Sequence, residues 1–157
     1  MPVSSFSELT EMNSLSTAGV VTVRLGLAAL TGAVVGFERE MRDRSAGLRT
    51  HMLISVASAA FAIIAISLFH AVSDENGANA DPIRLIEAVT AGVAFLAAGA
   101  IIREKERIRG LTSGANMWMA GAIGVACGTG FYVLAGIATV IVLIIMIVVR
   151  GVEKRFL

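Results

Sequence analysis

Residues 36–54 read GFEREMRDRSAGLRTHMLI, a stretch that places seven charged side chains between two long apolar runs. The whole chain has 157 residues, of which 56% are hydrophobic, and a mean hydropathy of +0.80. A soluble domain of this size cannot bury so much apolar surface, so the composition indicates a membrane protein. The charged stretch is then expected at a membrane surface, because charges are costly inside a bilayer.

Five apolar segments are each long enough to cross about 30 Å of hydrocarbon, which needs roughly 20 helical residues. The fourth and fifth segments form one uncharged run, which we divide at Cys127-Gly128-Thr129-Gly130 because two glycines permit a tight turn. We therefore expect an all-α membrane protein with one transmembrane domain (1–157). The five predicted transmembrane helices cover residues 18–37, 51–72, 83–102, 111–128 and 131–149.

Lysine and arginine in the loops predict the orientation, because basic loops are retained in the cytoplasm. Basic residues concentrate in 38–50, in 103–110 and in the tail 150–157. The outer-surface segment 1–17 and the acidic loop 73–82 contain no lysine or arginine. We therefore expect the N-terminus outside and the C-terminus in the cytoplasm.

The two basic loops resemble each other. Arg-Glu at 39–40 followed by AGLRT at 46–50 matches Arg-Glu at 103–104 followed by RGLTS at 109–113. This similarity predicts a parallel internal repeat, in which helices 1–2 and helices 3–4 are related by an axis along the membrane normal. Independent convergence on short basic loops is the alternative.

A few polar residues lie inside or at the ends of the apolar segments. Arg24 and Glu87 have similar depths in the first and third helices, so we expect a buried pair, with Arg84 as a competing partner. Such a pair either forms an ion or proton site or only fixes the helix register, and Arg24 could instead snorkel to headgroups. Glu38 ends the same stripe of the first helix as Arg24. Asn116 either lines a cavity or bonds a neighbouring helix, and we favour the bond.

The basic loops are also candidates for a binding surface. Contact with anionic lipid headgroups is the default expectation for arginines beside a membrane, and docking of a partner protein or a phosphate is the alternative. The expected docking residues are Arg39, Arg42, Arg44, Arg49, Arg103, Lys105, Arg107 and Arg109.

Sequence patterns of enzymes and metal sites are missing. The chain contains neither a G-x-x-x-x-G-K-[ST] nor a G-x-S-x-G motif. His51 and His70 bracket the second helix about 28 Å apart and cannot share one ion within a subunit. We expect no enzymatic activity, no metal site, no cofactor and no nucleic-acid partner.

Small residues line several helix faces, such as Ala28, Gly32 and Gly36 in the first helix. They permit close helix contact in a membrane. Because these faces exceed what five short helices can use internally, we expect a homo-oligomer, most simply a homodimer.

Four segments share the motif order of a known family. The motifs are G-x-E-R at 36–39, A-G-L-R-T at 46–50, D-P at 81–82 and R-G-L-T-S at 109–113, and the matching segments cover residues 24–40, 46–61, 81–104 and 109–132. In these segments the chain resembles the MgtC/SapB family of bacterial inner-membrane proteins.

The resemblance implies a multi-pass protein of the bacterial inner membrane, linked to virulence, growth at low magnesium and survival inside macrophages. It further implies a regulatory action through other membrane proteins, among them the ATP synthase and magnesium or phosphate transport systems. A channel or transporter for an ion or small solute is the alternative. The best-known members continue into a soluble cytoplasmic domain, so functions that depend on that domain are not expected to carry over.

Overall fold

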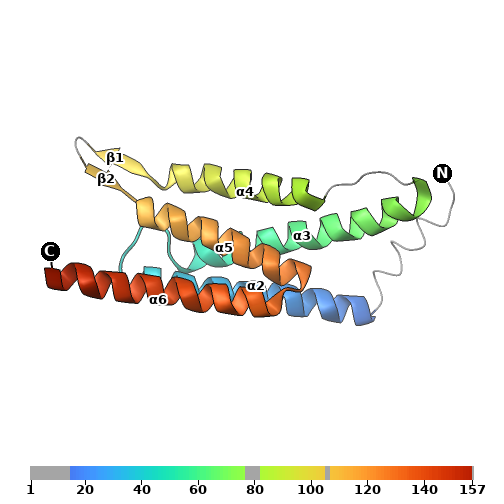
Figure 1. The fold of residues 1–157 in the computed structure, drawn as a ribbon, viewed down its shortest axis with the longest axis horizontal. Helices are drawn as coiled ribbons and strands as arrows, with labels where there is room; N and C mark the ends of the chain where they lie inside the picture. Colours follow the sequence, from blue (N-terminus) through green and yellow to red (C-terminus); the bar gives the residue numbers. More distant parts are fainter. Residues whose placement is uncertain (1–14, 77–81, 105–106, 157) are drawn as a thin grey trace.

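The computed structural model describes residues 15–76, 82–104 and 107–156. Each of the five predicted helices is present, and a short antiparallel hairpin joins the third to the fourth (Figure 1). The elements are α2 (Leu15–Glu40), α3 (Leu48–Asn76), α4 (Pro82–Gly99), β1 (Ile102–Glu104), β2 (Arg107–Arg109), α5 (Leu111–Thr129) and α6 (Tyr132–Phe156). Of the predicted outer-surface segment, residues 1–14 lie outside the described part of the chain.

Three of these helices are long and apolar enough to cross a membrane. Their candidate spans are Thr17–Glu40, Leu48–Phe69 and Tyr132–Val149, and α4 contributes a shorter apolar stretch, Ile86–Gly99. The outer surface of the bundle is also apolar, since Phe95 is 79% exposed and Val133 is 78% exposed. Contiguous exposed apolar surface of this kind suits contact with lipid.

The helices alternate in direction along one long axis (Figure 1). The connection 41–47, the β1–β2 hairpin and the end of α6 lie at one end, which we call the basic end. The start of α2 and the turn between α5 and α6 lie at the opposite end. This places the three predicted basic segments together; which end faces the cytoplasm stays a prediction.

Helix α3 packs between α2 and α5 with almost no side-chain layer in between. A Cβ atom on Gly36 would lie 2.8 Å from the Cα atom of Leu48, and one on Gly128 would lie 2.8 Å from the Cα atom of Ala59. Such distances are far below ordinary contact, so only glycine fits. The four glycines at these contacts are Gly32 and Gly36 of α2 and Gly124 and Gly128 of α5. The predicted close packing of the first helix is confirmed.

The break between α5 and α6 falls where the paired glycines predicted it. Gly130 has a φ of 86°, a left-handed conformation that a residue with a Cβ atom rarely adopts. Its N–H group donates to the carbonyl oxygens of Ala126 and Cys127, which ends the helix in the manner typical of a glycine cap. The two helices therefore run back along each other.

Several features differ from the prediction. Helices α2 and α3 extend beyond the predicted 18–37 and 51–72 at both ends. Helix α4 ends at Gly99 instead of residue 102, because the chain then forms β1 and β2, which pair Ile102 with Arg109. Helix α6 continues to Phe156, so most of the predicted tail 150–157 is helical. The two basic loops have different conformations, a turn in one and a hairpin in the other. The parallel repeat stays a prediction.

Candidate functional site at the basic end

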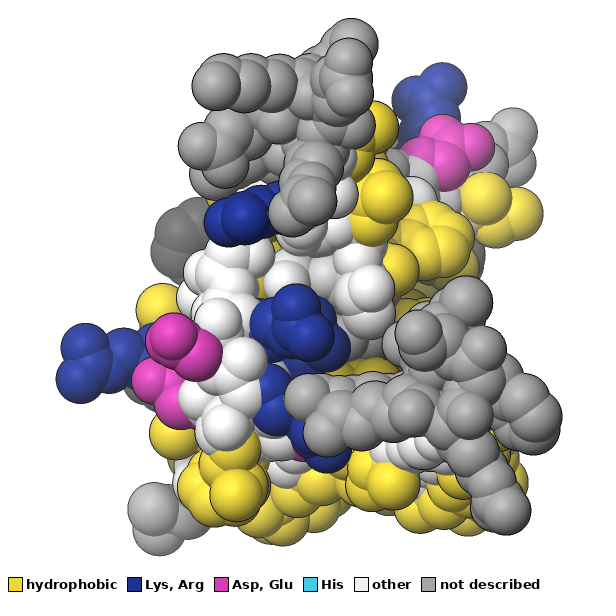
Figure 2. Space-filling view, turned by 90° about the vertical axis from the view of Figure 1, so that its left-hand side faces the viewer, with side chains coloured by type: hydrophobic (Ala, Val, Ile, Leu, Met, Phe, Trp, Pro, Cys, Tyr) yellow, Lys and Arg dark blue, Asp and Glu magenta, His cyan; other side chains and the backbone are white. Residues whose placement is uncertain are grey.

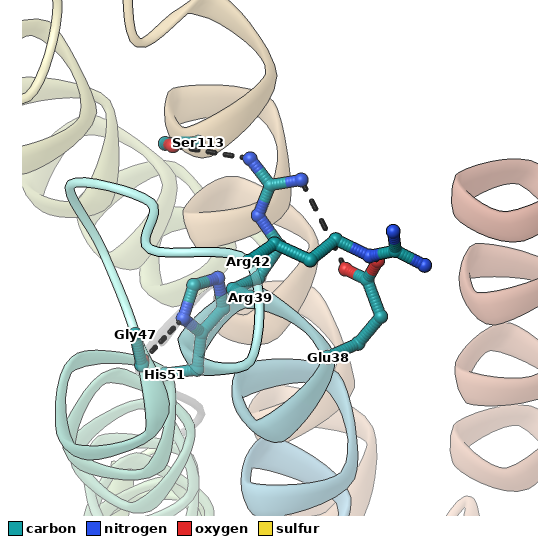
Figure 3. Close-up of polar contacts among 6 residues, drawn as sticks. All are labelled: Glu38, Arg39, Arg42, Gly47, His51 and Ser113. Carbon is teal, nitrogen blue, oxygen red and sulfur yellow. Dashed lines mark hydrogen bonds and ion pairs between the residues drawn. The ribbon is translucent and has the colours of Figure 1, made fainter. Parts of the chain in front are cut away.

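A buried arginine joins α2 to α5 at the basic end. Arg39 lies in the last turn of α2, is only 6% exposed, and donates from Nη2 to the hydroxyl oxygen of Ser113 over 3.2 Å (Figure 3). A hydrogen bond from a charged donor contributes about 1.5–3 kcal/mol. The sequence predicted Arg39 as a docking residue; the structure shows it buried and bonded to α5, and its part in docking stays a prediction.

The neighbouring carboxylate is shared between two arginines. Glu38 forms an ion pair with Arg42, one helical turn later, and its Oε2 atom lies 3.9 Å from Nη1 of Arg39. The Glu38 side chain is 11% exposed, so its charge is largely removed from solvent and needs these partners. Glu38 and Arg42 lie on the side of α2 that faces α6 (Figure 3).

Two hydrogen bonds of side chains help to fix the connection between α2 and α3. The backbone N–H of Leu48 donates to Oε2 of Glu40 over 2.9 Å. The Nδ1 atom of His51 lies 2.8 Å from the carbonyl oxygen of Gly47, and because a carbonyl only accepts, Nδ1 carries the proton. His51 is fully buried. It therefore holds the loop, while the side chain of His70 lies outside what the structure describes.

A cleft of about 640 Å³ opens between α2, α5 and α6 at the basic end. One part of its wall is polar, formed by Glu38, Arg39, Arg42, Arg44, Thr112 and Asn116. The other part is apolar, formed chiefly by Met119, Ile141, Val142, Ile145, Met146 and Val149. The cleft is thus amphipathic, with its charge near the end of the helices and its apolar wall along α6.

A second cavity of about 730 Å³ lies beside it, between the connection 41–47, the hairpin and the start of α5. Arg39, Arg44 and Thr112 line both cavities. Gly110 precedes the first residue of α5 as its N-cap, has a φ of 90° and offers no side-chain cap to the first turn. The N-terminus of a helix carries partial positive charge, so it adds to the charge of the arginines here.

Asn116 lies in the wall of the cleft. It is 6% exposed, and its amide nitrogen Nδ2 makes no hydrogen bond within the described part of the chain. The sequence left open whether Asn116 bonds a neighbouring helix or lines a cavity, and the favoured bond is not seen for Nδ2. Asn116 is among the residues that line the cleft, and its role stays a prediction.

The predicted pair of Arg24 and Glu87 does not form. Arg24 instead donates from Nη1 to the carbonyl oxygen of Gly128 over 2.9 Å, which links α2 to the end of α5. Glu87 and its predicted competitor Arg84 are exposed on α4. The pair was predicted from the similar depths of Arg24 and Glu87 in their helices. Helix α4 packs on α3 and α5, however, and so lies away from Arg24.

The remaining docking candidates lie at the basic end. Arg44, Arg49 and Arg109 are exposed and Arg42 is partly exposed. Arg103 and Arg107 lie in the two strands, and Lys105 is outside the described residues. Figure 2 views this end and shows basic side chains near the middle of the face, with hydrophobic side chains along its lower edge.

One partner could not be found from the sequence. Ser113, which binds Arg39, is separated from it by 74 positions in the chain. It was noticed only as part of a loop motif, and no sequence pattern links the two residues. The contact depends on how α2 packs against α5.

Comparison with known proteins places the chain in a family. The MgtC family model matches residues 25–155. The chain is 38% identical to "Putative magnesium transporter YhiD" of Escherichia coli K12 over 135 residues, 36% identical to "Protein MgtC" of Brucella abortus over 123 residues, and 37% identical to "Protein SapB" of Bacillus subtilis over 113 residues.

These alignments cover 86%, 78% and 71% of this chain, but 63%, 48% and 49% of the three relatives. The chain therefore spans between about half and two thirds of the length of these relatives. No solved structure matches it. The family match extends over nearly all of the described helices, and we conclude that this membrane protein belongs to the MgtC family.

Proposed function

We propose that the chain is a regulatory or interaction protein of the bacterial inner membrane. It acts by contacting another membrane protein or anionic lipid headgroups through its basic end, which faces the cytoplasm. The observation that carries this proposal is the gathering of Arg42, Arg44, Arg49 and Arg109 at one end of the bundle. An excess of positive charge at one surface suits docking and electrostatic steering of a partner.

The helical core supports a role at the surface. Glycine contacts bring the backbones of α2, α3 and α5 together, which leaves little room for a polar route along these three helices. Candidate partners follow from the family resemblance: the ATP synthase and magnesium or phosphate transport systems, in adaptation to low magnesium and in virulence. The proposed role involves no catalysed reaction.

A transporter for an ion or small solute is the second candidate, favoured by the name of the Escherichia coli relative. A site for desolvated Mg²⁺ needs several oxygen ligands held together. Within residues 15–76, 82–104 and 107–156, no three His, Cys, Asp or Glu side chains gather closely enough to hold one metal ion. We place contact at the basic end first because of the arginines gathered there, and the experiments below distinguish the two candidates.

Two experiments distinguish the docking function from the transporter function. Arg44, Lys105 and Arg107 are neutralised together to glutamine, with Arg42 kept as the partner of Glu38, and growth at low magnesium is measured together with membrane abundance. We expect the growth phenotype to be lost at unchanged abundance. Arg84→Gln is the matched control, since it removes an exposed arginine at the opposite end, and it should have no effect.

Purified protein in liposomes provides the other half of the test. The docking proposal expects no protein-dependent flux of Mg²⁺, protons or phosphate. Flux that disappears on substitution of Asn116 or Arg24 would overturn the proposal in favour of a transporter.

We also propose that the chain forms a homodimer. A Cβ atom added to Gly26 of α2, or to Gly92 or Gly99 of α4, would meet no atom of another described element within 4 Å. These outward glycines permit a close approach of helices from a second copy.

A further inference from the structure

The cleft between α2, α5 and α6 has more positive than negative charge at its mouth. Arg39, Arg42 and Arg44 contribute three guanidinium groups, against the single carboxylate of Glu38. Glu38 is already engaged by Arg42 and Arg39, whereas Arg44 is exposed and lines both this cleft and the neighbouring polar cavity. The start of α5 adds partial positive charge at the same place. The mouth is therefore suited to an anion.

A second polar group points to the same ligand from deeper in the cleft. Asn116 is 6% exposed, and its Nδ2 donor makes no hydrogen bond within the described chain. A buried donor without an acceptor costs about 1–3 kcal/mol, so an acceptor supplied by a ligand is favoured once the Asn116 side chain turns its covered amide toward the cleft that it lines. Asn116 lies five residues after the start of α5, about 7.5 Å further into the bundle. The expected ligand therefore has its anionic group at the mouth of the cleft and a hydrogen-bond acceptor further into the bundle.

The rest of the cleft is apolar and open to the bilayer. Its α6 wall extends from Val149 to Ile141, about 12 Å along the helix axis. Val149 is 49% exposed, Ile145 is 54% exposed and Ile141 is 50% exposed, so the wall is continuous with the apolar outer surface. A soluble anion would leave this wall uncovered, whereas a hydrocarbon chain would cover it.

We propose that this cleft is a specific site for one anionic phospholipid of the inner leaflet. The headgroup phosphate lies at the mouth, where Arg44 and Arg42 donate to its oxygens. An ester carbonyl oxygen of the lipid accepts from Nδ2 of Asn116, and an acyl chain lies along Ile145 and its neighbours on α6. The order of charge, amide donor and apolar wall along the cleft matches the order of phosphate, ester and acyl chain in a phospholipid.

The test is native mass spectrometry of the full chain in mild detergent, titrated with phosphatidylglycerol and with phosphatidylcholine of the same acyl chains. One phosphatidylglycerol should bind per protomer at least about tenfold more tightly than phosphatidylcholine, because both lipids carry the phosphate but the choline cation of phosphatidylcholine is repelled by Arg42 and Arg44. Equal affinity for the two lipids would overturn the proposal.

Two matched pairs of variants locate the site. Arg44→Gln should remove most of the preference for phosphatidylglycerol, whereas Arg49→Gln, an exposed arginine outside the cleft, should not. Ile145→Trp should fill the cleft and weaken binding by about tenfold or more, whereas Ile144→Trp should not. Ile144 is 53% exposed, nearly as much as Ile145, but does not line the cleft. Preference retained in Arg44→Gln, or undiminished binding in a folded Ile145→Trp variant, would refute the site.

Two further outcomes are decided by the same design. If Ile145→Trp fails to fold, the arginine pair decides alone, because both of those side chains are exposed. Displacement of the bound lipid by inorganic phosphate, with equal phosphate binding to wild type and Ile145→Trp, would show an anion site and refute a lipid site.

The inference rests on the proposed function in so far as both use arginines of the basic end. Their failures are nevertheless distinguishable, because Ile145→Trp leaves every charge in place. A variant that loses the lipid but keeps its contact with a partner leaves the docking proposal intact. A variant that loses the partner but keeps the lipid leaves the lipid site intact.

Discussion

Replacing Gly124 with alanine is expected to destabilise the protein, because α3 and α5 touch through their backbones at this point. A Cβ atom on Gly124 would overlap the carbonyl oxygen of Ser55 and would lie 2.8 Å from its Cα atom. Both atoms belong to the α3 backbone, so no side-chain rotation relieves the contact. The two helices must move apart, and α2 packs on α3 from the other side.

The magnitude follows from two opposing effects. Overpacking in a close-packed interior costs about 1–3 kcal/mol, and a contact with rigid backbone belongs at the upper end of that range. Alanine has a better helix propensity than glycine, which offsets about 1 kcal/mol. The free energy of unfolding should therefore fall by about 2 kcal/mol. Gly26→Ala is the matched control, since a Cβ atom there would meet no other part of the described chain within 4 Å, and it should be neutral or stabilising.

Unfolding of both variants and the wild type is measured by titration with a denaturing detergent in mild-detergent micelles, followed by circular dichroism. We expect a difference of about 3 kcal/mol between Gly124→Ala and Gly26→Ala, although both make the same chemical change in a helix. Equal stability of the two variants would refute the backbone contact between α3 and α5.

Three further predictions concern the topology, the contact of Arg24 and the oligomer. In a Cys127→Ala background, a cysteine at Ser45 should react from the cytoplasm and one at Ser73 from the outside, and the reverse labelling pattern would invert the orientation. The double exchange R24E with E87R should not restore the thermal stability lost in R24E, because Arg24 bonds a backbone carbonyl of α5; full rescue would contradict that geometry. Mass measurement in nanodiscs should give a dimer, and a monomer at every protein concentration would count against the proposed interface.

Much of the helix order could be predicted because it depends on local sequence. Charges cannot remain in hydrocarbon, so each basic loop marks the end of a helix. Gly130 predicts a break in the helix because its backbone freedom does not depend on the rest of the fold. The β1–β2 hairpin was missed because its apolar and basic residues are too few to separate a strand from a helix end. The positions of neighbouring helices along one another could not be predicted either, because no local sequence pattern encodes them.

The residues of the candidate site also fall into those that the sequence could predict and those that it could not. Exposed arginines such as Arg44 and Arg109 could be located from loop composition alone. The burial of Arg39 could not, because a basic residue in a loop motif has the same sequence pattern whether or not Ser113 lies beside it. Asn116 was recognised as unusual in an apolar helix, but its role depends on α6, which forms the opposite wall of the cleft.

The glycine contacts described above make one part of the bundle stiffer than the rest. Helices α2, α3 and α5 touch through backbone atoms and form one stiff unit, because any relative sliding brings backbone against backbone. Helix α4 is bordered by cavities of about 300 Å³ on its α3 side and about 360 Å³ on its α5 side, so it displaces fewer packed atoms when it tilts. Its end at Gly99 leads into the β1–β2 hairpin. A force applied to that hairpin would therefore tilt α4, while α2, α3 and α5 would keep their positions relative to one another.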